Sequence, residues 1–153
     1  LKSNKKIDYK LIHITGKPHY DYVMEKLKDV KIPENVTILN YSHEIPDLLM
    51  VSDLVIASSS AMTLAEISAI GLASILIPKA YTAGNHQVHN ANSYEEKNAS
   101  TVILEENLTG DLLYAKIEEL LNNDILRNDM GNNAKELGNV DAVKTLVDKI
   151  EKL

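Results

Sequence analysis

Three short stretches carry side chains that could contact a polar ligand. Ser58-Ser59-Ser60 follows the apolar run DLVIA, Glu66 lies in the helical pattern that comes next, and His86-Gln87 opens a later helical pattern. In parallel α/β sheets, ligands bind at the carboxyl ends of the strands. The order of these segments therefore predicts hydroxyl, carboxylate, imidazole and amide groups at one edge of a sheet.

The three serines allow two interpretations. Free N–H groups and the dipole at a helix N-terminus attract an anion such as phosphate, and serine hydroxyls add donors. Serine is also a favoured N-cap, so capping explains the same residues. The sequence contains neither a Walker loop nor a G-x-G-x-x-G pattern. The serines alone favour capping over phosphate binding.

Glu66 also allows two interpretations. If the helix begins at Thr63, the residues Thr63-Leu64-Ala65-Glu66 match a capping box, in which the glutamate satisfies a backbone donor. If it begins near Ala61, Glu66 lies beyond the first turn and its carboxylate is free. A free carboxylate there could accept both hydroxyls of a ribose, as acidic residues do in dinucleotide folds. The sequence leaves both open.

The histidine-rich segment favours recognition of neutral polar groups over metal binding. His86, Gln87, His89 and Asn90 combine donors and acceptors that suit sugar hydroxyls. Zinc requires more ligands than this cluster offers, and the chain has no cysteine. No nucleophile-elbow pattern supports a catalytic triad. His13 lies in an apolar strand, where we expect a core histidine, and we expect neither a metal nor a cofactor.

Apolar runs and turn residues predict alternating strands and helices. Strands are expected at 9–15, 36–39, 53–57, 73–77 and 101–104. Helices are expected at 19–30, 45–51, 61–70, 87–97, 109–122, 124–137 and 140–153, with Gly71 as the C-terminal cap of the third. This alternation is typical of an α/β fold, a parallel sheet covered by helices on both faces.

Bulk properties predict a soluble protein of one domain, residues 1–153. The hydrophobic and charged fractions, 44% and 25%, are typical of globular proteins. The net charge of −6 and the lack of Lys/Arg runs argue against nucleic-acid binding. The longest apolar stretch, near Gly71 to Pro78, is too short to cross a bilayer, and the first residues lack a signal-peptide pattern. We therefore expect a cytoplasmic location.

Taken together, three segments resemble the C-terminal half of the MurG-type N-acetylglucosaminyltransferases. They are LIHITGKPHY, SDLVIASSSAMTLAEISAIGLASILIP and GNHQVHNANSYEEKNAS, which occur in this order and cover most of residues 10–104. The remainder is similar only as a generic helical tail. Members of this family transfer N-acetylglucosamine from UDP to the undecaprenyl-pyrophosphoryl muramyl-pentapeptide lipid in peptidoglycan synthesis.

The resemblance implies a Rossmann-like domain that forms the C-terminal, donor-binding half of a GT-B glycosyltransferase. It places Glu66 on the ribose hydroxyls, and Gln87 with His86 on the sugar hydroxyls. The other implied substrate contacts are Tyr41 and Ser42 for uracil, and Ser59, Ala61, Met62 and Thr63 for the diphosphate. The implied partners are UDP-N-acetylglucosamine and the lipid-linked acceptor. No catalytic residue is implied in this chain.

The sequence departs from the family pattern in three places. Ser58 stands where family members can carry a basic residue, and His86 stands where they often carry glutamine. Nothing in Leu1 to Tyr9 resembles the first strand and its G-G-S-x-G loop, and the N-terminal acceptor domain with the general base is missing. We therefore expect a truncated donor-binding domain, inactive alone, from an enzyme peripheral to the inner face of the cell membrane.

A missing first strand would leave a gap in the sheet. In the doubly wound order the strands, named by starting residue, would run 36, 10, gap, 54, 74, 101. Open edges beside such a gap are costly. We expect the strand at 10–15 to pair directly with the strand at 54–57, or another chain to fill the gap through self-association.

Two other functions fit the same fold. A UDP-sugar epimerase would need acid and base groups in the cleft between two such domains, and product analysis would distinguish it from a transferase. A non-catalytic sugar-nucleotide-binding subunit would act with a separate membrane-bound partner. The residues immediately upstream of Leu1 would discriminate best, because a G-G-S-x-G loop there would identify the family.

Overall fold

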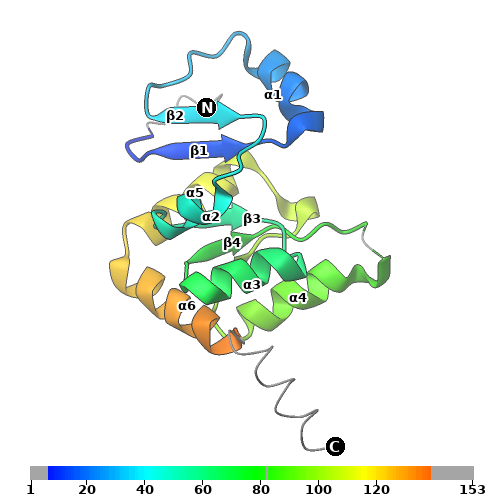
Figure 1. Ribbon diagram of the computed structural model, residues 1–153, viewed down its shortest axis with the longest axis vertical. Coiled ribbons are helices and arrows are strands. Elements are labelled where there is room, and N and C mark those ends of the chain that lie inside the picture. The colour runs from blue at the N-terminus through cyan, green and yellow to red at the C-terminus, as the bar shows by residue number, and fades with distance from the viewer. Residues whose placement is uncertain (1–6, 82, 139–153) are drawn as a thin grey trace, which may run out of the picture. The chain divides into compact units, whose positions relative to one another are not determined.

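The computed structural model describes residues 7–81 and 83–138, and the chain divides into two compact units, Leu1–Ile45 and Pro46–Leu153 (Figure 1). The first unit contains β1 (Leu11–Ile14), η1 (Lys17–His19), α1 (Tyr20–Leu27) and β2 (Val36–Leu39). From its last residue onward follow α2 (Ile45–Met50), β3 (Val55–Ala57), α3 (Ala61–Ile70), β4 (Ser74–Leu76), η2 (Ala83–Asn85), α4 (His86–Glu95), β5 (Thr101–Val102), η3 (Glu105–Asn107), α5 (Gly110–Leu121) and α6 (Asp124–Leu137).

The predicted parallel α/β fold is confirmed. Every strand and helix that we expect within the described residues is present, whereas the helix expected at 140–153 lies outside them. All strand pairs are parallel, β1 with β2 in one sheet, and β3 with β4 and β4 with β5 in the other. These are the neighbours expected on each side of the gap.

The unit Leu1–Ile45 is held together mainly by pairing at both ends of its strands. Asn35 Nδ2 donates to the carbonyls of Ile7 and Tyr9, both at 2.7 Å. At the other end, the backbone N–H and the hydroxyl of Thr15 both donate to the carbonyl of Leu39, at 2.9 and 3.2 Å. The two carboxyl ends are therefore fixed side by side.

The expectation of a buried His13 is wrong, because this side chain is exposed in β1. Among the described residues of this unit only Val36 is buried. A two-stranded sheet with one short helix has little interior, so an apolar strand sequence does not guarantee burial for each of its residues.

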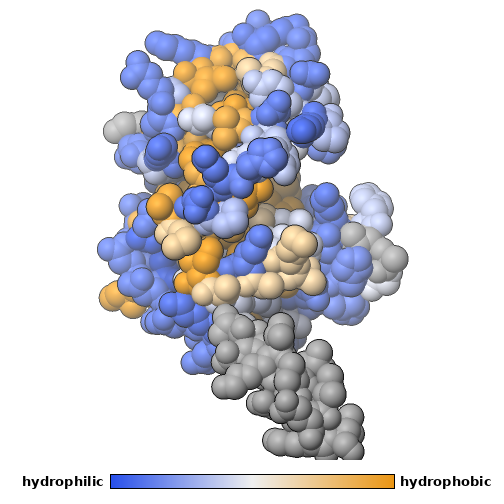
Figure 2. Space-filling model, in the orientation of Figure 1, coloured by the Kyte–Doolittle hydropathy of each residue, from blue (hydrophilic) through white to orange (hydrophobic). Residues whose placement is uncertain are grey.

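In the unit Pro46–Leu153, α3 and α4 pack on the sheet, in front of β3 and β4 in Figure 1. Ile67 of α3, Leu76 of β4, Ala91 of α4 and Ala134 of α6 are fully buried in one cluster. Polar residues cover much of the surface, with apolar residues among them (Figure 2). The most exposed large apolar side chains of this unit are Met50, Val51, Met62, Tyr81 and Ile125.

Two glycines allow α3 and α6 to approach closely. Gly71 ends α3 in the left-handed conformation, φ 76°, as the sequence predicts. A Cβ added to Gly131 would lie 2.2 Å from the carbonyl oxygen of Gly71. Only glycine at position 131 therefore fits this helix crossing, which fixes the C-terminal end of α3.

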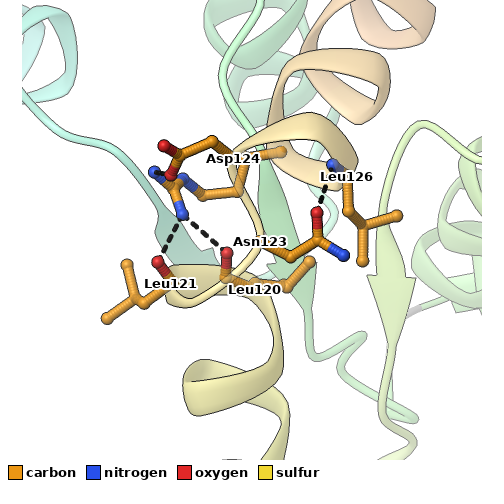
Figure 3. Close-up of polar contacts among 6 residues, drawn as sticks. Leu120, Leu121, Asn123, Asp124 and Leu126 are labelled. Carbon is orange, nitrogen blue, oxygen red and sulfur yellow. Dashed lines mark hydrogen bonds and ion pairs between the residues drawn. The ribbon is translucent and has the colours of Figure 1, made fainter.

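The turn between α5 and α6 is fixed by polar side chains (Figure 3). Asn123 caps α6 by accepting a hydrogen bond from the N–H of Leu126 at 3.0 Å. The guanidinium of Arg127 donates to the last carbonyls of α5, those of Leu120 at 2.7 Å and Leu121 at 2.6 Å, and pairs with Asp124. Arginine thus satisfies carbonyls that a helix end leaves unpaired.

The expected direct pairing of the strands at 10–15 and 54–57 is wrong. Within the described residues β1 is bonded to β2 and β3 to β4, and no ladder joins β1 to β3. Closure of the gap by another chain stays a prediction. The expectation that residues 1–153 form a single domain also stays a prediction.

Candidate functional site

The carboxyl ends of β3, β4 and β5 lie at one edge of their sheet because the three strands are parallel. Ser59, Lys79 and Glu105 follow these three strands. Hydrogen bonds join the β3 end to the β4 end through α4, and Glu105 joins the β5 end to the β4 end directly. We call the set formed by Ser59, Lys79, Ala80, Gln87, Asn90 and Glu105 the carboxyl-edge network. Of the groups expected at this edge, the network contains the hydroxyl of Ser59 and the amide of Gln87, whereas the expected places of Glu66 and His86 stay predictions.

Ser59 joins the end of β3 to the start of α4. Its hydroxyl donates to the carbonyl of Gln87 at 2.6 Å, and Asn90 Nδ2 donates to the Ser59 carbonyl at 3.1 Å. Ser59 is completely buried. In this structure it positions α4, and its expected contact with a diphosphate stays a prediction.

Gln87 is buried and the orientation of its amide is determined. Its Oε1 accepts a hydrogen bond from the backbone N–H of Lys79 at 3.0 Å. Because an N–H group can only donate, the oxygen must face Lys79 and the NH₂ group must face away. That NH₂ group makes no hydrogen bond within the described part of the chain. Gln87 can therefore donate to a ligand oxygen.

The N-terminus of α3 is capped by Ser60. Its Oγ accepts from the N–H of Thr63 at 3.2 Å and shares a hydrogen bond with the Thr63 hydroxyl at 2.8 Å. The helix begins at Ala61, so the capping interpretation holds for Ser60. The N–H groups of Ala61 and Met62 make no hydrogen bond to any described residue, and both residues are exposed. They leave donors for an anion.

Glu66 is not a capping residue. Because α3 begins at Ala61, Glu66 lies beyond the first turn, and the capping box with Thr63 does not form. Its side chain is half-buried and makes no hydrogen bond or ion pair with a described residue. Met62 and Thr63 precede it by four and three residues, so all three share one helix face. A carboxylate acceptor thus lies one turn from the free N–H donors.

The start of α4 has an unusual backbone. Gly84 and Asn85 both adopt positive φ, 63° and 52°, immediately before the exposed His86. His86 therefore follows a sharp change of chain direction, one residue before Gln87. Histidine and glutamine are adjacent here, but only Gln87 belongs to the carboxyl-edge network.

Tyr41 and Ser42 belong to the other unit, at the carboxyl end of β2. Ser42 Oγ accepts from the N–H of Glu44 at 3.0 Å. The half-exposed ring of Tyr41 meets that of His43 edge-on, with centroids 4.8 Å apart, and Lys17 Nζ lies 5.0 Å from the Tyr41 centroid. The loop is locally ordered around an exposed aromatic ring.

Sequence reasoning missed Glu105 and the role of Asn90. Glu105 Oε2 accepts a hydrogen bond from the N–H of Ala80 at 3.2 Å. Its position directly after an apolar strand was a usable signal, because that position lies at the carboxyl edge. The side-chain bond from Asn90 to Ser59 joins residues 31 positions apart, which local spacing does not reveal.

Comparison with known proteins identifies the family. The model of the glycosyltransferase family 28 C-terminal domain matches residues 1–146. The chain belongs to this family. The match continues well beyond residue 104, so the expectation that the last part is only a generic helical tail is wrong.

Curated relatives agree with this assignment. The chain is 42% identical over 146 residues to the UDP-N-acetylglucosamine–N-acetylmuramyl-(pentapeptide) pyrophosphoryl-undecaprenol N-acetylglucosamine transferase of Finegoldia magna. The aligned residues make up 95% of this chain and 39% of the relative. The transferase of the same name from Clostridioides difficile is 41% identical, over 95% of this chain and 36% of the relative. The chain thus spans about two fifths of the length of these relatives.

Solved structures show the same fold. Acinetobacter baumannii MurG superposes with a TM-score of 0.78 at 24% identity, over 93% of this chain and 41% of that protein. The glycosyltransferase VinC, solved in complex with dTDP, gives 0.70 at 16% identity, over 97% and 36%. These likenesses establish the Rossmann-like fold of a GT-B C-terminal domain.

The described residues contain neither a membrane-spanning helix nor a cluster of metal ligands. No helix among residues 7–81 and 83–138 has the length and apolar character needed to span a membrane. In the same residues, no three histidine, aspartate or glutamate side chains are grouped as metal ligands.

Proposed function

We propose that this chain is the donor-binding part of an enzyme that transfers N-acetylglucosamine from UDP-N-acetylglucosamine to the undecaprenyl-pyrophosphoryl muramyl-pentapeptide lipid. One observation carries the proposal: the unengaged carboxylate of Glu66 lies one turn from the free N–H groups at the start of α3. Acceptors for ribose hydroxyls and donors for a diphosphate are thus combined on one helix. The names of the relatives at about 40% identity supply the reaction.

The first turn and the middle of α3 contribute differently to the proposed donor site. Glu66 accepts hydrogen bonds from both ribose hydroxyls. The N–H groups of Ala61, Met62 and Thr63 approach the diphosphate, where the positive end of the helix dipole stabilises the charge that develops as UDP departs. Because the N–H of Thr63 already bonds to Ser60, Ala61 and Met62 are the stronger donors.

The sugar hydroxyls and the uracil ring are assigned to residues outside α3. Gln87 donates through its NH₂ group to a sugar hydroxyl, with the neighbouring His86 as a second contact. Ser59 holds this pair in position, because its hydroxyl donates to the carbonyl of Gln87. Tyr41 and Ser42 receive the uracil through backbone groups and the exposed ring.

The acceptor lies outside the residues assigned here. In the proposed reaction the acceptor hydroxyl attacks the anomeric carbon, the bond to UDP breaks, and a base removes the hydroxyl proton. We assign that base to the acceptor-binding half of the enzyme and no catalytic residue to this chain. The lipid acceptor places the whole enzyme at the inner face of the cell membrane, as a peripheral protein.

Calorimetry with UDP tests the proposal on this chain. We expect UDP to bind, and Glu66→Ala to weaken binding by roughly tenfold or more because two hydrogen bonds to a charged acceptor are lost. Glu96→Ala is the matched control, since it removes an exposed carboxylate from the end of α4 and should leave the affinity unchanged. No binding by the wild-type chain, or equal affinity in Glu66→Ala, would contradict the assignment.

A further inference from the structure

The loop after β4 is fixed by side-chain oxygens from two other elements. Gln87, in the first turn of α4, accepts from the N–H of Lys79 at 3.0 Å. Glu105, the first residue of η3, accepts from the N–H of the next residue, Ala80, at 3.2 Å. Two consecutive backbone donors are thus bound by acceptors that are 18 positions apart in the sequence.

This arrangement couples Glu105 to Gln87. The Gln87 amide is oriented by the N–H of Lys79, so the position of that N–H decides where the NH₂ group points. Ala80 is covalently joined to Lys79, and its own N–H is bound by Glu105. Displacement of Ala80 would therefore move the N–H group of Lys79, and the Gln87 amide would no longer be held in one orientation.

We propose that Glu105 is a positioning residue for recognition of the donor sugar. Its carboxylate, placed at the carboxyl end of β5, holds the loop after β4 and thereby keeps the Gln87 NH₂ group directed at a sugar hydroxyl. A carboxylate suits this role because a hydrogen bond to a charged acceptor is stronger than one to a neutral acceptor. The inference rests on the proposed function, because it takes Gln87 as a sugar contact.

The exposure of Glu105 makes it suitable for mutation. Replacing an exposed side chain leaves no cavity, so the variants should fold. Glu105→Ala removes the acceptor, whereas Glu105→Gln keeps an oxygen that can still accept from Ala80. Glu106→Ala is the matched control, since Glu106 is equally exposed and makes no hydrogen bond or ion pair with the described residues.

Amide hydrogen exchange measured by NMR tests the contact without any ligand. In Glu105→Ala the N–H of Ala80 should exchange roughly threefold to tenfold faster than in wild type, because one hydrogen bond is lost. Glu106→Ala should retain the wild-type rate, and Glu105→Gln, which keeps a weaker neutral acceptor, should exchange at a rate between those of wild type and Glu105→Ala. An unchanged rate for Ala80 in Glu105→Ala would overturn the inference.

A comparison of two ligands tests the positioning role. Glu105→Ala should bind UDP-N-acetylglucosamine roughly threefold to tenfold more weakly while its affinity for UDP stays unchanged, and Glu105→Gln should restore part of the lost sugar affinity. Equal losses for both ligands would indicate a general structural role and overturn the inference. The proposed function stands if wild type binds both ligands and UDP binding depends on Glu66. In that case, an unaltered affinity of Glu105→Ala for UDP-N-acetylglucosamine refutes only the role of Glu105. If wild type binds neither, the proposed function fails and the inference fails with it.

Discussion

At the scale of single residues, hydrogen-bond partners separate supporting side chains from those available to a ligand. Ser59 is fully buried and bonded to α4, and the oxygen of Gln87 is bonded to Lys79. Glu66 is half-buried, and its carboxylate is bonded to no described residue. A carboxylate without a partner among the described residues keeps its oxygens available to accept hydrogen bonds from a ligand.

The difference between polar side chains with and without a hydrogen-bond partner can also be measured in the core, at Ser74. Its hydroxyl is fully buried in β4 and has no partner among the described residues. Ser74→Ala should therefore raise the free energy of unfolding by up to about 1 kcal/mol, because an unsatisfied polar group is removed. Thermal or urea unfolding would measure the change.

Ser68 supplies the control for this prediction. Its hydroxyl is equally buried but lies 2.5 Å from the hydroxyl of Tyr94. Ser68→Ala should lower the free energy of unfolding by about 1 kcal/mol, because Tyr94 loses one of two buried partners and keeps the carbonyl of Leu64 at 3.2 Å. A loss of stability in Ser74→Ala as large as that in Ser68→Ala would show that Ser74 has a partner after all.

At the scale of elements, the crossing of α3 and α6 fixes the helix that carries Glu66. Gly131→Ala should destabilise the protein by about 1–3 kcal/mol, because the new Cβ meets the backbone carbonyl of Gly71, which cannot move aside cheaply. This loss should exceed the gain of up to about 1 kcal/mol from the higher helix propensity of alanine. Thermal unfolding would measure it.

Gly110 is the control for Gly131. It is the first residue of α5, and a Cβ added there meets no atom within 4 Å. Gly110→Ala should therefore leave the melting temperature unchanged or raise it slightly. Stability losses of equal size at positions 110 and 131 would count against a specific contact between α3 and α6.

The elements were predictable where local chemistry defines them. Ser60 and Gly71 are strong cap residues, so the predicted bounds of α3 agree with the structure, as do those of α6. The contacts from Gln87 to Lys79 and from Glu105 to Ala80 were not predictable, because they join segments 8 and 25 positions apart through the packing of the whole unit. His13 was misassigned for a related reason, since burial depends on what covers a strand.

At the scale of the whole molecule, the strand neighbours within each sheet were predictable from the doubly wound pattern, but the closure of each sheet was not. The pattern specifies neighbours such as β3 and β4, and the structure confirms them. It does not specify what β1 and β3 contact on their remaining edges. Sequence periodicity reports which residues face a core and contains no information about a partner strand supplied from elsewhere.

At the same scale, the groups assigned to the chain determine the activity that we expect of it alone. In the proposed function this chain supplies groups for the donor and no base for the acceptor hydroxyl, and general base catalysis contributes about 10²–10⁴-fold to such reactions. We therefore expect this chain, incubated with labelled UDP-N-acetylglucosamine and the lipid acceptor, to form no product above the background without protein. The full-length Finegoldia magna transferase, assayed in parallel, is the positive control. Measurable transfer by this chain would show that it contains a catalytic base, and His86, exposed beside Gln87, would then be the first residue to replace.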